Sequence, residues 1–187
     1  INGRCQCNSQ SRNEIRWTAT MMVKLSKKEM SEINQFASLR WQLSRAAGVV
    51  NQRRDNNRTD DDVDRLGYKG EYVVSKIFNL PFNPGVAGID DGYDLWINDL
   101  SVDVKTTFYP SGVLLFKSIE SFKADVGILV TATKDENTFN VVGFIPRKEF
   151  EKKSKVFNGN GMAVHQDNLY PIERLWKYTK QKELLNV

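Results

Sequence analysis

Residues 126–133 constrain the fold more than any other part of the chain, because they are almost continuously apolar. A strand with apolar side chains on both faces must be covered on both faces, so we expect it at the centre of a sheet flanked by helices. The prediction is an α/β or α+β fold with a mixed sheet. Shorter apolar or alternating segments predict further strands at residues 94–98, 102–108, 114–116, 139–145 and 162–164.

Helices are predicted before and after these strands. Ser26 and Glu29 have the spacing of a capping box, and apolar residues then recur at helical spacing, which predicts a helix over about residues 26–50. Three acidic residues at 60–62 suit the N-terminus of a second helix, which ends before Pro81. The remaining two predicted helices are a short one that begins at Pro146 and a closing one over residues 172–185.

The chain of 187 residues has the length of one domain with a modest extension. Residues 1–22 lack the apolar core of a secretory signal and include the pair Met21 and Met22, so we expect a tail, a tag or upstream read-through there. Residues 23–59 are expected to form a basic N-terminal helix and a loop. Residues 60–187 are expected to form the folded core.

Basic residues are concentrated near the N-terminus, although the net charge of the chain is only +4. Residues 24–58 contain eight basic and three acidic residues, so this segment carries a charge of +5. Such a segment suits binding to a phosphate backbone, but a solvated helix face, a dimer contact or packing on the domain explains it as well. The candidate DNA-binding residues of this segment are Arg45, Arg53, Arg54 and Arg58.

Several classes of protein are excluded by composition. Cys5, Cys7 and His165 are the only cysteines and histidine, which is too few for a zinc site of four such ligands or for a disulfide framework. No apolar run approaches the roughly 18 residues of a membrane-spanning helix, so no membrane partner is expected. We expect a reducing cytoplasm, either bacterial or of a phage-infected cell.

Charged residues interrupt the predicted hairpin at residues 94–108. Asp103 and Lys105 are two residues apart on one strand, so their side chains share a face. Asp94 begins the partner strand, where pairing brings it near Asp103. Two carboxylates and an ammonium group at one place suit phosphodiester hydrolysis, because carboxylates hold hard divalent cations and a lysine can orient or deprotonate the attacking water.

At these residues the sequence resembles the PD-(D/E)xK nuclease superfamily, whose signature is an acid, a spacer and then acid-x-Lys on the following strand. Here the signature stands as Asp94, eight intervening residues, and Asp103-Val104-Lys105. Glu71 matches the glutamate that many members carry on the helix before the hairpin. Residues 70–176 more narrowly resemble a group of small predicted nucleases from phage and environmental sequences.

The resemblance implies a restriction-endonuclease-like core, with a mixed sheet flanked by helices, and a metal-dependent deoxyribonuclease that cuts DNA. It implies that Glu71, Asp94, Asp103 and the Val104 carbonyl bind Mg²⁺ or Mn²⁺, and that Lys105 assists the water. A homodimer would suit a structure-selective junction resolvase, which is one alternative. A non-catalytic nucleic-acid-binding module with the same fold is the other.

Some choices stay open at this point. Tyr93 stands where the superfamily name has proline, and Asp90 or Asp91 could replace Asp94 as the early acid; we prefer Asp94 because it begins the strand. Gln166 and Tyr170 have a spacing similar to a motif of exonuclease-like members, which makes Gln166 a further DNA-binding candidate. Trp41, Trp96 and Trp176 are expected to pack in the core or between elements.

Overall fold

A five-stranded mixed sheet is the centre of the molecule, with strand order β1-β6-β5-β3-β2. The computed structural model describes residues 21–46, 48, 58–82, 92–135, 137–159 and 161–185. Strands β3 and β5 are parallel, and the other neighbouring pairs are antiparallel. The expected mixed sheet is thus confirmed. Its strands are β1 (Met21–Lys24), β2 (Leu95–Ile97), β3 (Leu100–Thr107), β5 (Val126–Ala132) and β6 (Thr138–Pro146).

Strand β5 is buried along its whole length, as its apolar sequence predicts. Ile128 and Val130 belong to the hydrophobic core that the N-terminal helices cover. Leu129 belongs to a second core on the opposite face of the sheet. Because both faces of β5 exclude water, the strand needs apolar side chains at successive positions.

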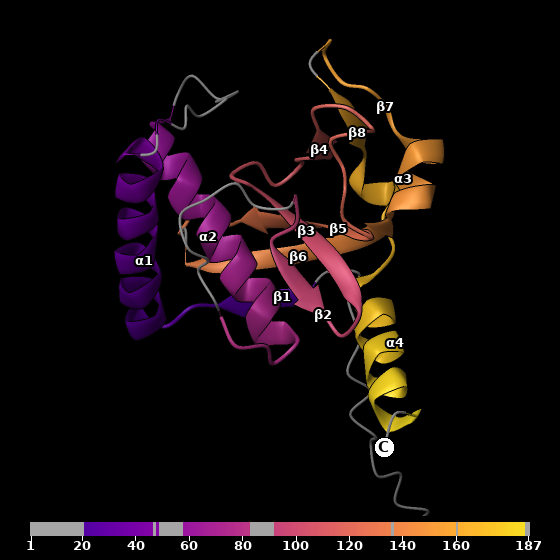
Figure 1. Ribbon diagram of the computed structural model, residues 1–187, viewed down its shortest axis with the longest axis horizontal. Helices are drawn as coiled ribbons and strands as arrows, with labels where there is room; N and C mark the ends of the chain where they lie inside the picture. The colour runs from indigo at the N-terminus through magenta and orange to yellow at the C-terminus, as the bar shows by residue number, and fades with distance from the viewer. Residues whose placement is uncertain are drawn as a thin grey trace, which may run out of the picture.

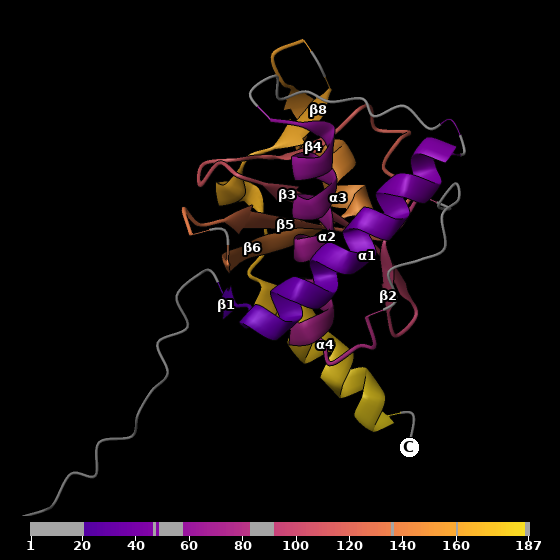
Figure 2. The same ribbon diagram turned by 90° about the vertical axis from the view of Figure 1, so that its left-hand side faces the viewer.

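Helices α1 (Lys27–Ala46) and α2 (Asp60–Ile77) cover one face of the sheet (Figures 1 and 2). The predicted capping box at the start of α1 is present: the Ser26 amide donates to Glu29 Oε2 at 2.7 Å, and the Glu29 amide donates to Ser26 Oγ at 3.3 Å. Thr59 and Asp62 form a second capping box on α2. Of the apolar residues on α1, Ile33 and Ala37 are fully buried.

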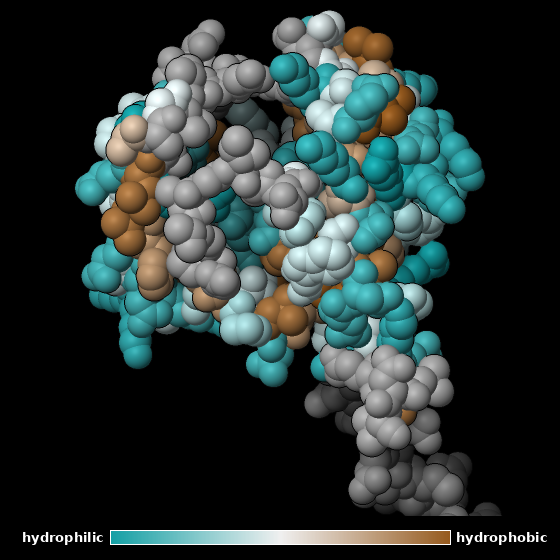
Figure 3. Space-filling view, in the orientation of Figure 1, coloured by the Kyte–Doolittle hydropathy of each residue, from teal (hydrophilic) through white to brown (hydrophobic). Residues whose placement is uncertain are grey.

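The outer face of α1 leaves apolar side chains in solvent. Phe36, Leu39 and Leu43 follow one another at helical spacing and are exposed. Figure 3 shows apolar side chains on the α1 side of the molecule. The helical periodicity therefore predicted the helix correctly, but it did not show which apolar residues are buried.

The opposite face of the sheet is covered by a smaller antiparallel sheet and by helix α3 (Arg147–Lys153). The rings of Phe116, Phe122 and Phe150 pack together here at centroid distances of 4.1 to 5.2 Å. A 3₁₀ turn at Gln166–Asn168 leads into α4 (Ile172–Leu185), which is anchored by buried Ile172 and Leu175 and then extends away from the body of the molecule. The small sheet contains β4 (Leu114–Phe116), β8 (Met162–Val164) and β7 (Lys155–Val156).

The predicted tail needs one correction at its end. Met21 and Met22 are not part of a tail, because they pair with Val141 and Asn140 of β6. Of the explanations left open for the basic segment, packing on the domain applies to α1, since Ile33 is buried in the same core as α2 and the sheet. A four-residue edge strand has too few side chains to show a periodicity, and β7, with two exposed residues, was missed for the same reason.

Helix α2 approaches β3 closely at Gly70. A Cβ atom at this position would lie 1.8 Å from Thr106 Oγ1 and 2.9 Å from Thr106 Cβ. The Thr106 hydroxyl is buried and has no hydrogen-bond partner in the described part of the chain. Glycine is therefore required at position 70 for close packing, and this packing sets where the next residue, Glu71, lies.

We expect Gly70→Ala to lower the free energy of unfolding by about 1–3 kcal/mol, because the added methyl group forces α2 away from β3. Gly67 is the matched control, since within the described residues nothing lies within 4 Å of its Cβ position. Gly67→Ala should stabilise the protein by about 0.5–1 kcal/mol through helix propensity. Urea unfolding measures both, and equal destabilisation by the two variants would contradict the steric explanation.

Within the described residues, no helix combines the length and the apolar character needed to cross a membrane.

Candidate active site

Among the described residues, no strand pairs with the outer edge of β3 beyond Val102. Strand β2 pairs only with the first three residues of β3, Leu100 to Val102. Asp94 hydrogen-bonds to the next part of this edge. Its amide donates to the Val102 carbonyl at 2.8 Å, and its Oδ2 accepts a hydrogen bond from the Val104 amide at 2.6 Å. The N–H and C=O of one strand residue point to the same side. The Val104 carbonyl therefore points toward the edge that Asp94 occupies.

Asp103 and Lys105 share one face of β3, as their spacing predicts. The Asp103 side chain is buried, with only 6% of the residue exposed, and its Oδ1 forms an ion pair with Lys105 Nζ. Lys105 Nζ also lies 5.1 Å from the centroid of the Phe116 ring. With 40% of its side chain exposed, Lys105 has access both to the buried carboxylate and to solvent.

Glu71 on α2 completes the cluster. Burial, and next the negative charge of Asp94, raise the pKa of Glu71 from its ordinary value of 4.5 to about 8. Lys105 acts in the opposite direction and Asp103 adds to the increase. Glu71 therefore lies within electrostatic range of Asp94, Asp103 and Lys105.

Arg40 is a member of this cluster that motif analysis missed. It lies on α1, and its positive charge counteracts the increase in the pKa of Glu71. Its guanidinium carbon lies 4.9 Å from the centroid of the Tyr68 ring on α2. From the sequence, Arg40 was only one of the eight basic residues of the N-terminal segment. No motif connects it to the hairpin, which begins more than fifty residues later.

The predicted DNA-binding residues have structural contacts of their own. Arg45 Nη2 lies 3.7 Å from Asp60 Oδ2, and the Arg58 guanidinium lies 4.0 Å from the centroid of the Phe108 ring. Gln166 Nε2 donates to two backbone carbonyls in the loop after β3, at 2.8 and 2.7 Å, so it ties the 3₁₀ turn to that loop. The other early candidates lie outside the described residues: Arg53, Arg54, Asp90 and Asp91.

The carboxylates do not enclose an ion as they stand. Within the described residues, no three His, Cys, Asp or Glu side chains lie close enough together to hold a metal. The donor chemistry nevertheless fits a hard divalent cation, because three carboxylates and a backbone carbonyl offer only oxygen. Burial and the charge of Asp94 raise the pKa of Glu71 more than Arg40 and Lys105 lower it.

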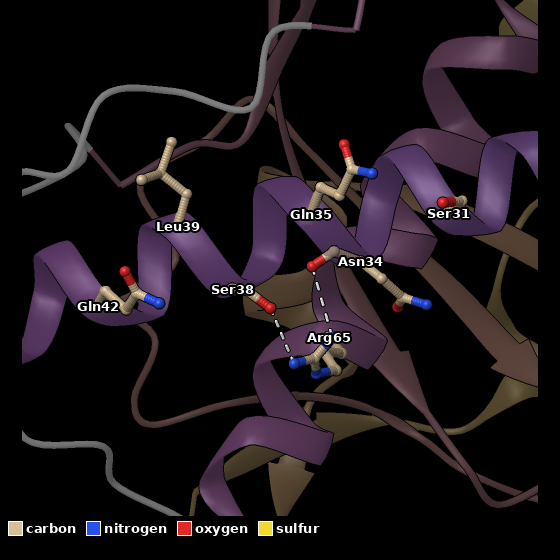
Figure 4. Close-up of a pocket in the computed structure, with 7 residues that line it drawn as sticks. All are labelled: Ser31, Asn34, Gln35, Ser38, Leu39, Gln42 and Arg65. Carbon is tan, nitrogen blue, oxygen red and sulfur yellow. Dashed lines mark hydrogen bonds between the residues drawn. The ribbon is translucent and has the colours of Figure 1, made fainter.

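A surface hollow of about 500 Å³ lies elsewhere, along α1 and the start of α2 (Figure 4). Arg65 crosses it and is held by Ser38 Oγ at 2.9 Å, the Asn34 carbonyl at 3.4 Å and Asp61 Oδ2 at 2.7 Å. The residues that line the hollow include none of the carboxylate cluster. It is therefore not a pocket of the candidate active site.

Comparison with known proteins adds no assignment: no family model matches the chain, and no curated protein matches its sequence significantly.

Proposed function

We propose that this protein is a divalent-metal-dependent endonuclease that hydrolyses phosphodiester bonds of DNA. The observation that carries the proposal is the grouping of Asp94, Asp103 and Lys105 at one edge of β3, with Glu71 of α2 within electrostatic range of all three. The resemblance of these residues to the PD-(D/E)xK signature supports the same function. In this proposal, α2 and the β2–β3 hairpin are the start of a restriction-endonuclease-like core.

The carboxylates of Glu71, Asp94 and Asp103, with the Val104 carbonyl, would hold Mg²⁺ or Mn²⁺. When bound, the cation would supply Lewis-acid polarisation of the phosphate and acidify water. Asp103 would have to exchange its ion pair with Lys105 for the cation. The loss of a proton from Glu71 would accompany binding, because an added positive charge favours the carboxylate.

Lys105 has two roles in this proposal. Once released from Asp103, its ammonium group would orient the attacking water beside the phosphate. It would also offset the negative charge that develops on the phosphate oxygens during attack. Its partial exposure lets it reach a substrate on the solvent side.

One observation favours a second candidate, a non-catalytic nucleic-acid-binding module with the same fold. Lys105 already neutralises Asp103, and in the described part of the chain no set of three ligands encloses a cation. A binding module needs no cation at this cluster. Metal dependence therefore distinguishes the two functions.

The test incubates the purified protein with supercoiled, linear duplex, single-stranded and branched DNA, each with Mg²⁺, Mn²⁺ or EDTA. Lys105→Ala protein, purified in parallel, controls for contaminating nucleases. We expect cutting that requires the metal and is lost in the variant. DNA binding without any cutting would instead support the binding module.

A further inference from the structure

Trp96 contradicts the expectation that it packs in the core. It lies on β2, at the edge of the five-stranded sheet, and is 50% exposed. Its neighbours Leu95 and Ile97 belong to the core beneath α1 and α2. Because side chains alternate along a strand, Trp96 points to the opposite face of the sheet. An indole ring kept half in water at an edge forgoes hydrophobic stabilisation that burial would provide.

The exposed ring lies beside the candidate active site. Trp96 pairs with Ser101 across the hairpin, and Ser101 shares a face of β3 with Asp103 and Lys105. Asp94 precedes Trp96 by two residues, which is about 7 Å along a strand. One nucleotide of an extended single strand spans a comparable distance.

Tyr93 holds the orientation of the indole. The two rings meet edge to face, with centroids 5.1 Å apart and planes at 74°. Such a contact fixes the indole and leaves area on its faces open for stacking. The ring is thus both oriented and accessible, which is what an aromatic stacking platform requires.

Positive charge flanks this platform. The stem of Lys123 packs on Gly92, where an added Cβ atom would lie 2.8 Å from Lys123 Cδ. Lys123 is exposed. Arg147 lies next to Lys123, because its Nη1 donates to the Lys123 carbonyl at 3.5 Å. Its side chain is 41% exposed. Aromatic rings beside lysine and arginine are the combination by which proteins bind single-stranded nucleic acid.

We propose that Trp96 stacks on an unpaired DNA base next to the phosphate at the carboxylate cluster, while Lys123 and Arg147 contact the neighbouring backbone. In a duplex each base is covered by its neighbours, so only an unpaired or terminal base offers its face to the indole. The inference rests on the proposed function and deepens it: the substrate class is single-stranded DNA or DNA with frayed ends.

The experiment measures binding in EDTA, so that cleavage does not interfere. Fluorescence anisotropy compares a labelled single strand with a closed-end duplex of the same composition. Trp96→Ala should weaken single-strand binding about tenfold and duplex binding less than about twofold, because stacking requires an open base face. Trp96→Phe should stay within about threefold of the wild type on both.

Trp41→Ala is the matched control. Trp41 is similarly exposed, at 36%, but lies on α1, on the other side of the sheet. It should leave both affinities unchanged. Equal losses on single strand and duplex for Trp96→Ala, or an effect of Trp41→Ala as large as that of Trp96→Ala, would overturn the inference, as would wild-type protein that binds no single-stranded DNA.

The outcome of the Trp96 experiment can be distinguished from the outcome of the cleavage experiment. Selective loss of single-strand binding in Trp96→Ala supports the stacking platform even if the protein cuts no DNA. Metal-dependent cutting combined with unchanged single-strand binding in Trp96→Ala retains the nuclease and removes the platform. Thermal unfolding of each variant checks the fold. If the alanine variant is unstable, Trp96→Leu, which keeps apolar bulk but has no aromatic face, should show the same selective loss of single-strand binding.

Discussion

Replacing Lys105 with methionine is expected to reduce metal-dependent DNA cleavage about a thousandfold, the scale for loss of a group that stabilises charge developing in the transition state. Methionine has a side chain of similar length, so much of the volume beside the Phe116 ring is kept while the charge is lost. Asp103→Asn should reduce cleavage to a similar extent, because it removes one of the carboxylates proposed to hold the cation. Initial rates on the preferred DNA form, at saturating metal, measure the effect.

Stability measurements separate a lost function from a lost fold. Lys105→Met leaves the buried Asp103 carboxylate without its cation, which should cost about 1–2 kcal/mol because the lysine is partly exposed. The double variant Asp103→Asn/Lys105→Met removes both charges and should recover part of this loss. Lys182→Met breaks another Lys–Asp pair, with Asp99, and should leave cleavage unchanged. Cleavage that survives in both single variants would refute the assigned site.

Replacing Glu71 with glutamine is expected to change how stability depends on pH. The native pKa of Glu71 is raised to about 8 by burial and by Asp94, against an ordinary value of 4.5. Between these values the native state keeps a proton that the unfolded chain releases, so the free energy of unfolding falls as the pH rises. From about pH 5 to about pH 9 this contribution should lower wild-type stability by about 2–4 kcal/mol.

Glu71→Gln has no such proton to lose, so its stability should decline less over the same range and exceed that of the wild type at alkaline pH. Chemical unfolding at several pH values measures this difference. Mg²⁺ should restore part of the wild-type stability at alkaline pH and have less effect on the variant. Parallel stability curves for the two proteins would contradict the raised pKa of Glu71.

Glu29 provides a control with the opposite sign. Burial raises its pKa, but hydrogen bonds from Lys76 and Ser26 outweigh this effect and bring the pKa down to about 2. The carboxylate therefore stabilises the native state above its ordinary pKa of 4.5, and that stability is lost as the pH falls toward 2. Glu29→Gln should destabilise the protein at neutral pH, where Glu71→Gln should have the reverse effect.

The candidate site could be predicted in part from local spacing. Asp103 and Lys105 share a strand face by alternation alone, and a short turn brings Asp94 to the same edge. The contribution of Arg40 could not be predicted, because it depends on how α1 packs against α2. The exposure of Trp96 was predicted wrongly, since the pattern of a short edge strand does not show which of its faces is covered.

Local sequence patterns are enough to specify the elements and the central strand. Periodicity and capping residues are local properties, so the helices at residues 27–46 and 60–77 and the buried strand at 126–132 follow from neighbouring side chains. Tertiary structure alone decided that residues 21–24 join the sheet and that Gly70 packs on Thr106. It also decided the raised pKa of Glu71, because desolvation and charge–charge interactions depend on distances between segments that are far apart along the chain.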